Sequence, residues 1–79
     1  LKRPDRVMVF SDEVVILDYK FGTEKHDMKY AKQVARYKEL ISQMKQFSGK
    51  NVSAYIWYYF KNELVKVDSP EAITTINLS

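Results

Sequence analysis

The stretch Val14-Val15-Ile16-Leu17-Asp18-Tyr19-Lys20 decides the fold of this chain. Four aliphatic residues in a row are typical of a buried strand. Because side chains alternate between the two faces of a strand, Asp18 and Lys20 point to one face and Tyr19 to the other. Two charges at the end of an apolar strand have two interpretations. Either the strand emerges into solvent there, or the carboxylate and the ammonium belong to a cation-binding reactive site.

A second short strand precedes this one. Val7-Met8-Val9-Phe10 is followed by the polar turn Ser11-Asp12-Glu13, and this pattern predicts an antiparallel hairpin. In such a hairpin Asp5, at the start of one strand, lies near Asp18, at the end of the other. We therefore expect their carboxylates to lie within about 6 Å of one another, with Lys20 in the same space, where they can share a Mg²⁺ ion.

One long helix is predicted over residues 28–47, with Asp27 as its N-cap and Ser48-Gly49 as its stop. Its apolar residues recur at spacings of four and three, which indicates a core-facing stripe. Gln33 and Tyr37 are i, i+4 neighbours, and periodicity alone favours a surface glutamine beside a core tyrosine. His26 is assigned to the solvated loop before the helix.

The rest of the chain predicts two more strands. Residues 52–60 are apolar on both faces, which favours a central strand parallel to residues 14–20 in a βαβ unit. Its aromatic residues are assigned mainly to core packing, with base stacking as the alternative. Residues 64–67 predict an edge strand guarded by Lys66, and Ser69-Pro70-Glu71-Ala72 predicts a helix start. The fold class is α/β, with a small mixed sheet of about four strands.

Composition limits the class of protein. The 79 residues make one small domain, and the absence of cysteine excludes disulfides and thiolate metal sites, which is compatible with a cytoplasmic location. No long apolar run is present, so no membrane partner is expected. A net charge of +3 suits a polyanionic partner such as DNA.

Two motifs together resemble a known family. Pro4-Asp5, then twelve residues, then Asp18-Tyr19-Lys20 is similar to the PD-(D/E)XK nuclease signature. Gln33-Val34-Ala35-Arg36-Tyr37 resembles the Q-x-x-x-Y motif of the RecB-like branch, the C-terminal nuclease domain of AddAB-type and RecB-type helicase–nucleases. The resemblance covers residues 3–60 and implies that residues 1–79 are a single, partial domain with a restriction-endonuclease-like core.

The resemblance implies a metal-dependent DNA exonuclease in recombination or repair, with a helicase domain or subunit as its partner. Asp5, Asp18 and the backbone carbonyl of Tyr19 would hold Mg²⁺ or Mn²⁺. Lys20 would orient the attacking water or stabilise the transition state, and Gln33 and Tyr37 would position the site. The basic residues expected to contact the DNA backbone are Arg6, Lys29, Lys32 and Arg36; the alternative is that the basic helix residues are merely solvated.

A second hypothesis is a non-catalytic DNA-binding or structural module that retains the nuclease core. In the family an acidic or His residue on a preceding helix usually completes the site, and none precedes Pro4 here. The isolated fragment is therefore expected to bind metal weakly and cleave poorly. Without that helix, one sheet face is expected to be covered by homodimer formation or by residues 70–79.

Overall fold

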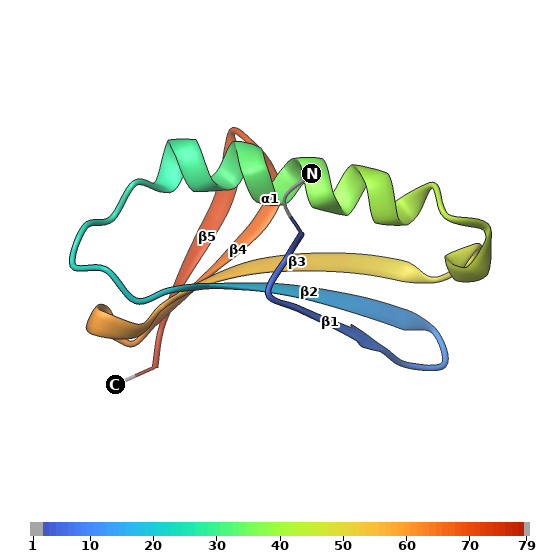
Figure 1. The fold of residues 1–79 in the computed structure, drawn as a ribbon, viewed down its shortest axis with the longest axis horizontal. Helices are drawn as coiled ribbons and strands as arrows, with labels where there is room; N and C mark the ends of the chain where they lie inside the picture. Colours follow the sequence, from blue (N-terminus) through green and yellow to red (C-terminus); the bar gives the residue numbers. More distant parts are fainter. Residues whose placement is uncertain (1–2, 79) are drawn as a thin grey trace.

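The computed structural model describes residues 3–78 (Figure 1). It contains one α-helix, five strands and two short 3₁₀ helices in this part of the chain. In chain order the elements are β1 (Arg6–Val9), β2 (Glu13–Lys20), α1 (Asp27–Ser42), η1 (Lys45–Phe47), β3 (Asn51–Tyr58), η2 (Tyr59–Lys61), β4 (Glu63–Ser69) and β5 (Ala72–Asn77).

The five strands form one mixed sheet in the order β1-β2-β3-β4-β5, with α1 lying across one of its faces (Figure 1). β2 and β3 are parallel, whereas the other neighbouring strands are antiparallel. The predicted hairpin, the parallel βαβ unit and the α/β class are therefore confirmed. The expected number of about four strands was one too low, because residues 72–77 add β5 at the edge beyond β4.

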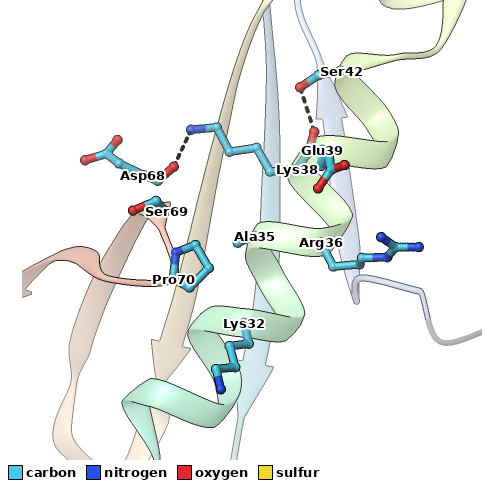
Figure 2. Close-up of a pocket in the computed structure, with 9 residues that line it drawn as sticks. All are labelled: Lys32, Ala35, Arg36, Lys38, Glu39, Ser42, Asp68, Ser69 and Pro70. Carbon is cyan, nitrogen blue, oxygen red and sulfur yellow. Dashed lines mark hydrogen bonds between the residues drawn. The ribbon is translucent and has the colours of Figure 1, made fainter.

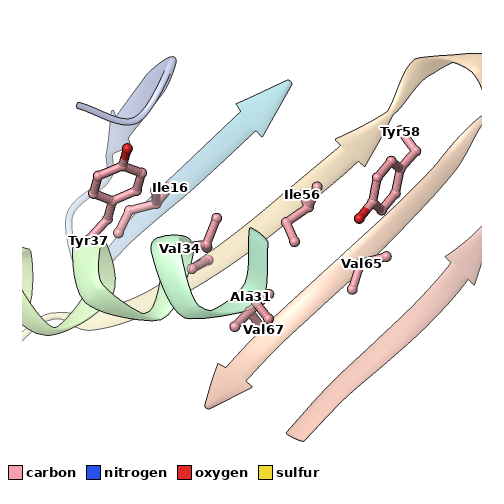
Figure 3. Close-up of a cluster of buried hydrophobic side chains, with 9 residues drawn as sticks. Ile16, Ala31, Val34, Tyr37, Ile56, Tyr58, Val65 and Val67 are labelled. Atoms are coloured by element: carbon pink, nitrogen blue, oxygen red, sulfur yellow. The ribbon is translucent and has the colours of Figure 1, made fainter. Parts of the chain in front are cut away.

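The core lies between α1 and the face of the sheet that it covers. Along β2, Val14 and Ile16 are fully buried, whereas Val15 and Leu17 on the other face are only half-buried. Figure 3 shows α1 side chains grouped with those of β2, β3 and β4. The buried apolar residues of this cluster are Ile16, Ala31, Val34, Tyr37, Ala54, Ile56, Tyr58, Val65 and Val67. The alternation of β2 thus explains which face receives the helix.

The opposite sheet face carries half-buried apolar side chains, among them Leu17, Tyr55 and Trp57. No element within residues 3–78 packs over this face. The expectation that residues 70–79 fold across it was wrong for the described part of that segment, since residues 72–77 pair edge-on with β4. Homodimer formation through this face stays a prediction. No helix within residues 3–78 combines the length and apolarity needed to cross a membrane.

The C-terminal helix start and the edge position of residues 64–67 were also wrong. Ser69-Pro70-Glu71 forms the turn of the β4–β5 hairpin, in which the Ala72 backbone N–H donates to Ser69 Oγ over 3.1 Å. Four β-branched residues follow Ala72 in residues 73–76, and such residues favour a strand. Lys66 therefore lies in an inner strand, paired with Tyr55 on one side and Thr74 on the other.

The helix is shorter than predicted at its C-terminal end. It ends at Ser42, and Met44 is already extended with φ −75° and ψ 131°. Sixteen helical residues span about 24 Å, and eight strand residues span about 26 Å, so α1 already matches β2 and β3 in length. The chain must then reverse to bring Asn51 beside Glu13, where β3 begins. Gly49 supports this reversal with a φ of +82°.

The helix start also differs from the predicted cap. His26 occupies the N-cap position, and Asp27 is the first helical residue. The Asp27 carboxylate does not cap the helix but accepts a hydrogen bond from the Tyr58 hydroxyl over 2.8 Å. Lys25 lies nearby and forms a 2.9 Å ion pair with Glu63 of β4. These contacts attach the start of α1 to β3 and β4.

We expect Tyr58→Phe to lower the free energy of unfolding by about 1.5–3 kcal/mol, because the Asp27 carboxylate loses its hydroxyl donor. Tyr55→Phe is the matched control, since the Tyr55 hydroxyl makes no hydrogen bond within residues 3–78. Urea unfolding of the two variants measures the difference. Equal stability of both variants would contradict the structural role assigned to this hydrogen bond.

The same hydroxyl predicts a pH dependence. Burial, together with the hydrogen bond to Asp27, raises the pKa of Tyr58 above its ordinary value of 10.0. The stabilisation from protonated Tyr58 is therefore complete below pH 10.0 and is lost as the pH rises above it. In Tyr58→Phe this part of the alkaline loss of stability should be absent.

Candidate active site

Asp18 and Lys20 meet on the face of β2 that lies under α1. Asp18 is 4% exposed and is the one buried charged residue within residues 3–78. Lys20 Nζ lies 2.9 Å from Asp18 Oδ2, which forms an ion pair at the end of the strand. The interpretation that the strand end emerges into solvent is therefore wrong for Asp18. The acid is held in the covered part of the sheet with its lysine beside it.

Asp5 approaches this pair from the start of β1. The register pairs Arg6 with Leu17, so Asp5 comes next to Asp18 as the antiparallel ladder continues. Asp5 Oδ2 accepts a hydrogen bond from the Tyr19 backbone N–H over 2.8 Å. Tyr19 thus contributes its amide to the position of Asp5, while the role of its carbonyl as a ligand stays a prediction.

The Asp18 carboxyl is electrostatically costly in its charged form. Burial raises its pKa above the ordinary value of 3.8; Lys20 opposes this shift and Asp5 adds to it. The stabilisation from the protonated form is present below pH 3.8 and is lost as the pH rises through the raised pKa. The strand end therefore brings Asp18 close to Asp5 and to one lysine. Additional positive charge beside Asp18 would lower the free-energy cost of its charged form.

The donor set fits one hard divalent cation. Apart from the ion pair with Lys20, Asp18 Oδ2 is a buried oxygen that accepts no hydrogen bond from the described residues. Two carboxylates suit Mg²⁺, which often takes one or two of them and completes its shell with water and phosphate oxygens. Within residues 3–78 there is no group of three or more His, Cys, Asp or Glu residues that could enclose an ion.

Two tyrosines of α1 complete the surroundings of Lys20. The ammonium of Lys20 lies 4.3 Å from the centroid of the Tyr30 ring, within the range of a cation–π interaction. Tyr37 is 7% exposed, and burial, followed by the charge of Asp18, raises the pKa of its hydroxyl. Gln33 is half-buried one turn from each tyrosine, and its side chain makes no hydrogen bond within residues 3–78.

Sequence reasoning did not assign Tyr30 to the site. It counted Tyr30 in the apolar stripe of the helix and among the residues that fit the family resemblance, but did not give it a contact with Lys20. The available signal was its spacing: Tyr30 precedes Tyr37 by seven residues, so both fall on the same side of the helix. A tyrosine one turn before Gln33 therefore faces the sheet as Tyr37 does.

The four basic residues expected to contact DNA are not brought together. Lys29, Lys32 and Arg36 are exposed on α1 at positions i, i+3 and i+7, so they form one stripe on the solvent side. Arg6 pairs with Leu17 and so projects from the opposite face of the sheet, away from Asp18. The alternation along β1 is the physical reason for this separation.

A groove of about 530 Å³ lies between α1 and the β4–β5 turn (Figure 2), and neither Asp5 nor Asp18 lines it. Lys32, Arg36 and Pro70 are among its lining residues. The Lys38 ammonium at this groove donates to the Asp68 backbone carbonyl over 3.3 Å and so joins the helix to the turn. The groove is distinct from the end of β2, because neither Asp18 nor Lys20 lines it.

Comparison with known proteins shows the family of the chain. A family model described as the PD-(D/E)XK nuclease superfamily matches residues 3–78, nearly the whole chain. The matched range includes Asp5, Asp18 and Lys20. No curated protein and no solved structure matched the chain.

Proposed function

Because the chain belongs to the PD-(D/E)XK nuclease superfamily, we propose that it is a metal-dependent deoxyribonuclease domain of the RecB-like branch. The observation that carries this proposal is the buried Asp18, paired with Lys20 at 2.9 Å and adjoined by Asp5. Further support comes from Gln33 and Tyr37, which match the branch motif and lie on the helix that covers this strand end.

Members of this superfamily generally use divalent metal ions. In this chain Asp5 and Asp18 would hold Mg²⁺ or Mn²⁺, with the Tyr19 carbonyl as the third ligand that the family implies. The bound ion would supply positive charge at the scissile phosphate and increase the acidity of water there.

The protein's own groups would then act on the phosphate and the attacking water. The Lys20 ammonium stabilises negative charge that develops on the phosphate, since it is charged and aimed at the site by the carboxylate and by the Tyr30 ring. The raised pKa of Tyr37 keeps its hydroxyl protonated and able to donate a hydrogen bond. Gln33, free of hydrogen bonds to the described residues, would orient water or a phosphate oxygen.

The wider context of the proposal is an exonuclease attached to a helicase domain or subunit and acting in DNA recombination or repair in the cytoplasm. The exposed basic stripe Lys29, Lys32 and Arg36 supports contact with a DNA backbone beside the site. Arg6 would contact DNA only along the other sheet face.

A non-catalytic DNA-binding module is the second candidate function. It is favoured by one observation: no group of three or more His, Cys, Asp or Glu residues that could hold a metal ion is found within residues 3–78. A cleavage assay separates the two functions. The chain is incubated with single-stranded and duplex DNA in Mg²⁺, in Mn²⁺ and in EDTA. Degradation in either metal and none in EDTA supports the nuclease, whereas DNA binding without degradation supports the module.

Metal binding has a thermodynamic consequence that does not require cleavage. We expect Mg²⁺ or Mn²⁺ to raise the melting temperature, because an ion between Asp5 and Asp18 removes their mutual repulsion. At a metal concentration about one hundred times the Kd, the gain is about 2.7 kcal/mol. Thermal unfolding with and without metal measures it, and Asp18→Asn should abolish it. A melting temperature that stays the same in the presence of Mg²⁺ and of Mn²⁺ would argue against a cation site.

A further inference from the structure

Three aromatic rings form a row at the exposed end of the sheet: Tyr19, Phe21 and Tyr59. The Tyr19 and Phe21 ring centroids are 5.9 Å apart, and those of Phe21 and Tyr59 are 5.7 Å apart. Phe21 is 68% exposed and Tyr59 is 64% exposed, so neither contributes much to the core. Two large exposed rings that contact one another indicate a binding surface rather than a role in core packing.

The row lies next to the proposed catalytic lysine. Phe21 directly follows Lys20 at the end of β2, and Tyr59 directly follows Tyr58 at the end of β3. Because β2 and β3 are parallel and Lys20 pairs with Tyr58, both rings leave the sheet at the same edge. A hollow of about 390 Å³ is lined by Tyr19, Lys20, Phe21 and Tyr30 among others, so two rings of the row and the lysine open into the same space. The third ring, Tyr59, lies beside this hollow, where it contacts Phe21.

The geometry of the rings leaves their faces available. The planes are tilted by 44° between Tyr19 and Phe21 and by 51° between Phe21 and Tyr59, so the rings do not stack closely on each other. A flat heterocycle can therefore lie against either exposed ring. Unpaired nucleobases present such planes in succession, whereas the bases of a duplex are already stacked within the helix.

The charges around the row suit a phosphate backbone. Lys61 is exposed in the same 3₁₀ turn as Tyr59, and Arg6 lies on the same sheet face as Tyr19. The acidic residue that lines the hollow is Glu24. Its carboxylate forms a 2.6 Å hydrogen bond with His26 Nε2. Exposed rings beside basic side chains are the combination that proteins use to bind single strands.

We propose that Tyr19, Phe21 and Tyr59 form a base-stacking platform that binds single-stranded DNA and leads the strand to Lys20. The proposal rests on the proposed nuclease function for the identity of the polynucleotide. Its consequence is a substrate preference: the domain engages a single strand or an unpaired end more tightly than a blunt duplex.

The test is equilibrium binding in EDTA, measured as the fluorescence anisotropy of a labelled oligothymidine of about 15 nucleotides. Phe21→Ala and Tyr59→Ala should each lower the affinity by about tenfold, and the affinity for a blunt duplex should change by less than about twofold. Phe21→Trp should retain binding, whereas Phe21→Leu, which is apolar but has no aromatic face, should lose it. Phe10→Ala is the matched control, because Phe10 is 52% exposed in the β1–β2 turn at the other end of the sheet.

The outcomes separate this proposal from the nuclease function. Ring-dependent binding of single strands without any cleavage in Mg²⁺ would retain the platform and overturn the nuclease. Cleavage by a chain whose Phe21→Ala and Tyr59→Ala variants bind oligothymidine normally would retain the nuclease and overturn the platform. The platform would also be overturned if both variants lost duplex binding equally, or if sedimentation showed that they convert a self-associated protein to a monomer.

Discussion

Replacing Asp18 with asparagine should abolish metal-dependent cleavage and leave the protein folded. The substitution keeps the shape of the side chain but removes the charge that would hold the ion and orient Lys20. Loss of one such electrostatic contribution costs about 10²–10³-fold in rate, so activity should fall at least that far. The measurement is the initial rate of DNA degradation in Mg²⁺ at equal protein concentration.

Asp12→Asn is the matched control for this experiment. Asp12 is an exposed acid in the β1–β2 turn, so the control removes the same charge far from Lys20. Its rate should equal that of the unsubstituted protein. Equal rates for all three proteins would show that Asp18 takes no part in the reaction.

Stability should not fall together with activity in Asp18→Asn. Because burial raises the pKa of Asp18, its charged form weakens the fold at neutral pH in the absence of metal. The neutral amide removes that cost, so the melting temperature without metal should not fall. Loss of activity together with lower stability would instead indicate that the variant is misfolded.

Replacing Ile56 with alanine should have the largest effect on stability. Ile56 is fully buried in the central strand, paired with Asp18 of β2 on one side and Val65 of β4 on the other. Truncation removes apolar contacts and leaves a cavity, at a cost of about 2–5 kcal/mol. Small domains have about 5–15 kcal/mol in total, so this one truncation should remove a large part of the stability.

Ile76→Ala is the matched control for the core substitution. Ile76 lies in the edge strand β5 and is 40% exposed, so the same truncation should cost less than about 1 kcal/mol. Guanidinium unfolding followed by circular dichroism measures both variants. A loss at Ile76 as large as that at Ile56 would contradict the assignment of the core to the helix-covered face.

The sequence alone determined the β1–β2 hairpin and the βαβ unit of this protein. The aliphatic run of β2, the short hairpin before it and the periodic helix after it were sufficient to predict the βαβ unit, because each pattern has a period that suits one element. Alternation along β2 also predicted that Asp18 and Lys20 share a face, and the structure places them 2.9 Å apart. These features depend on local spacing, which is fully present in the chain.

Only the tertiary structure decided where the elements end and which residues each side chain contacts. The pattern at Ser69-Pro70 suits either a helix start or a hairpin turn, and pairing of residues 72–77 with β4 selects the turn. The helix ends at Ser42 because the sheet below it ends, which no local pattern records. The contact of Lys20 with Tyr30 and the row formed by Phe21 and Tyr59 join segments distant in sequence. Such contacts arise because the parallel pairing of β2 and β3 brings separate strand ends to one edge, and that depends on the whole sheet.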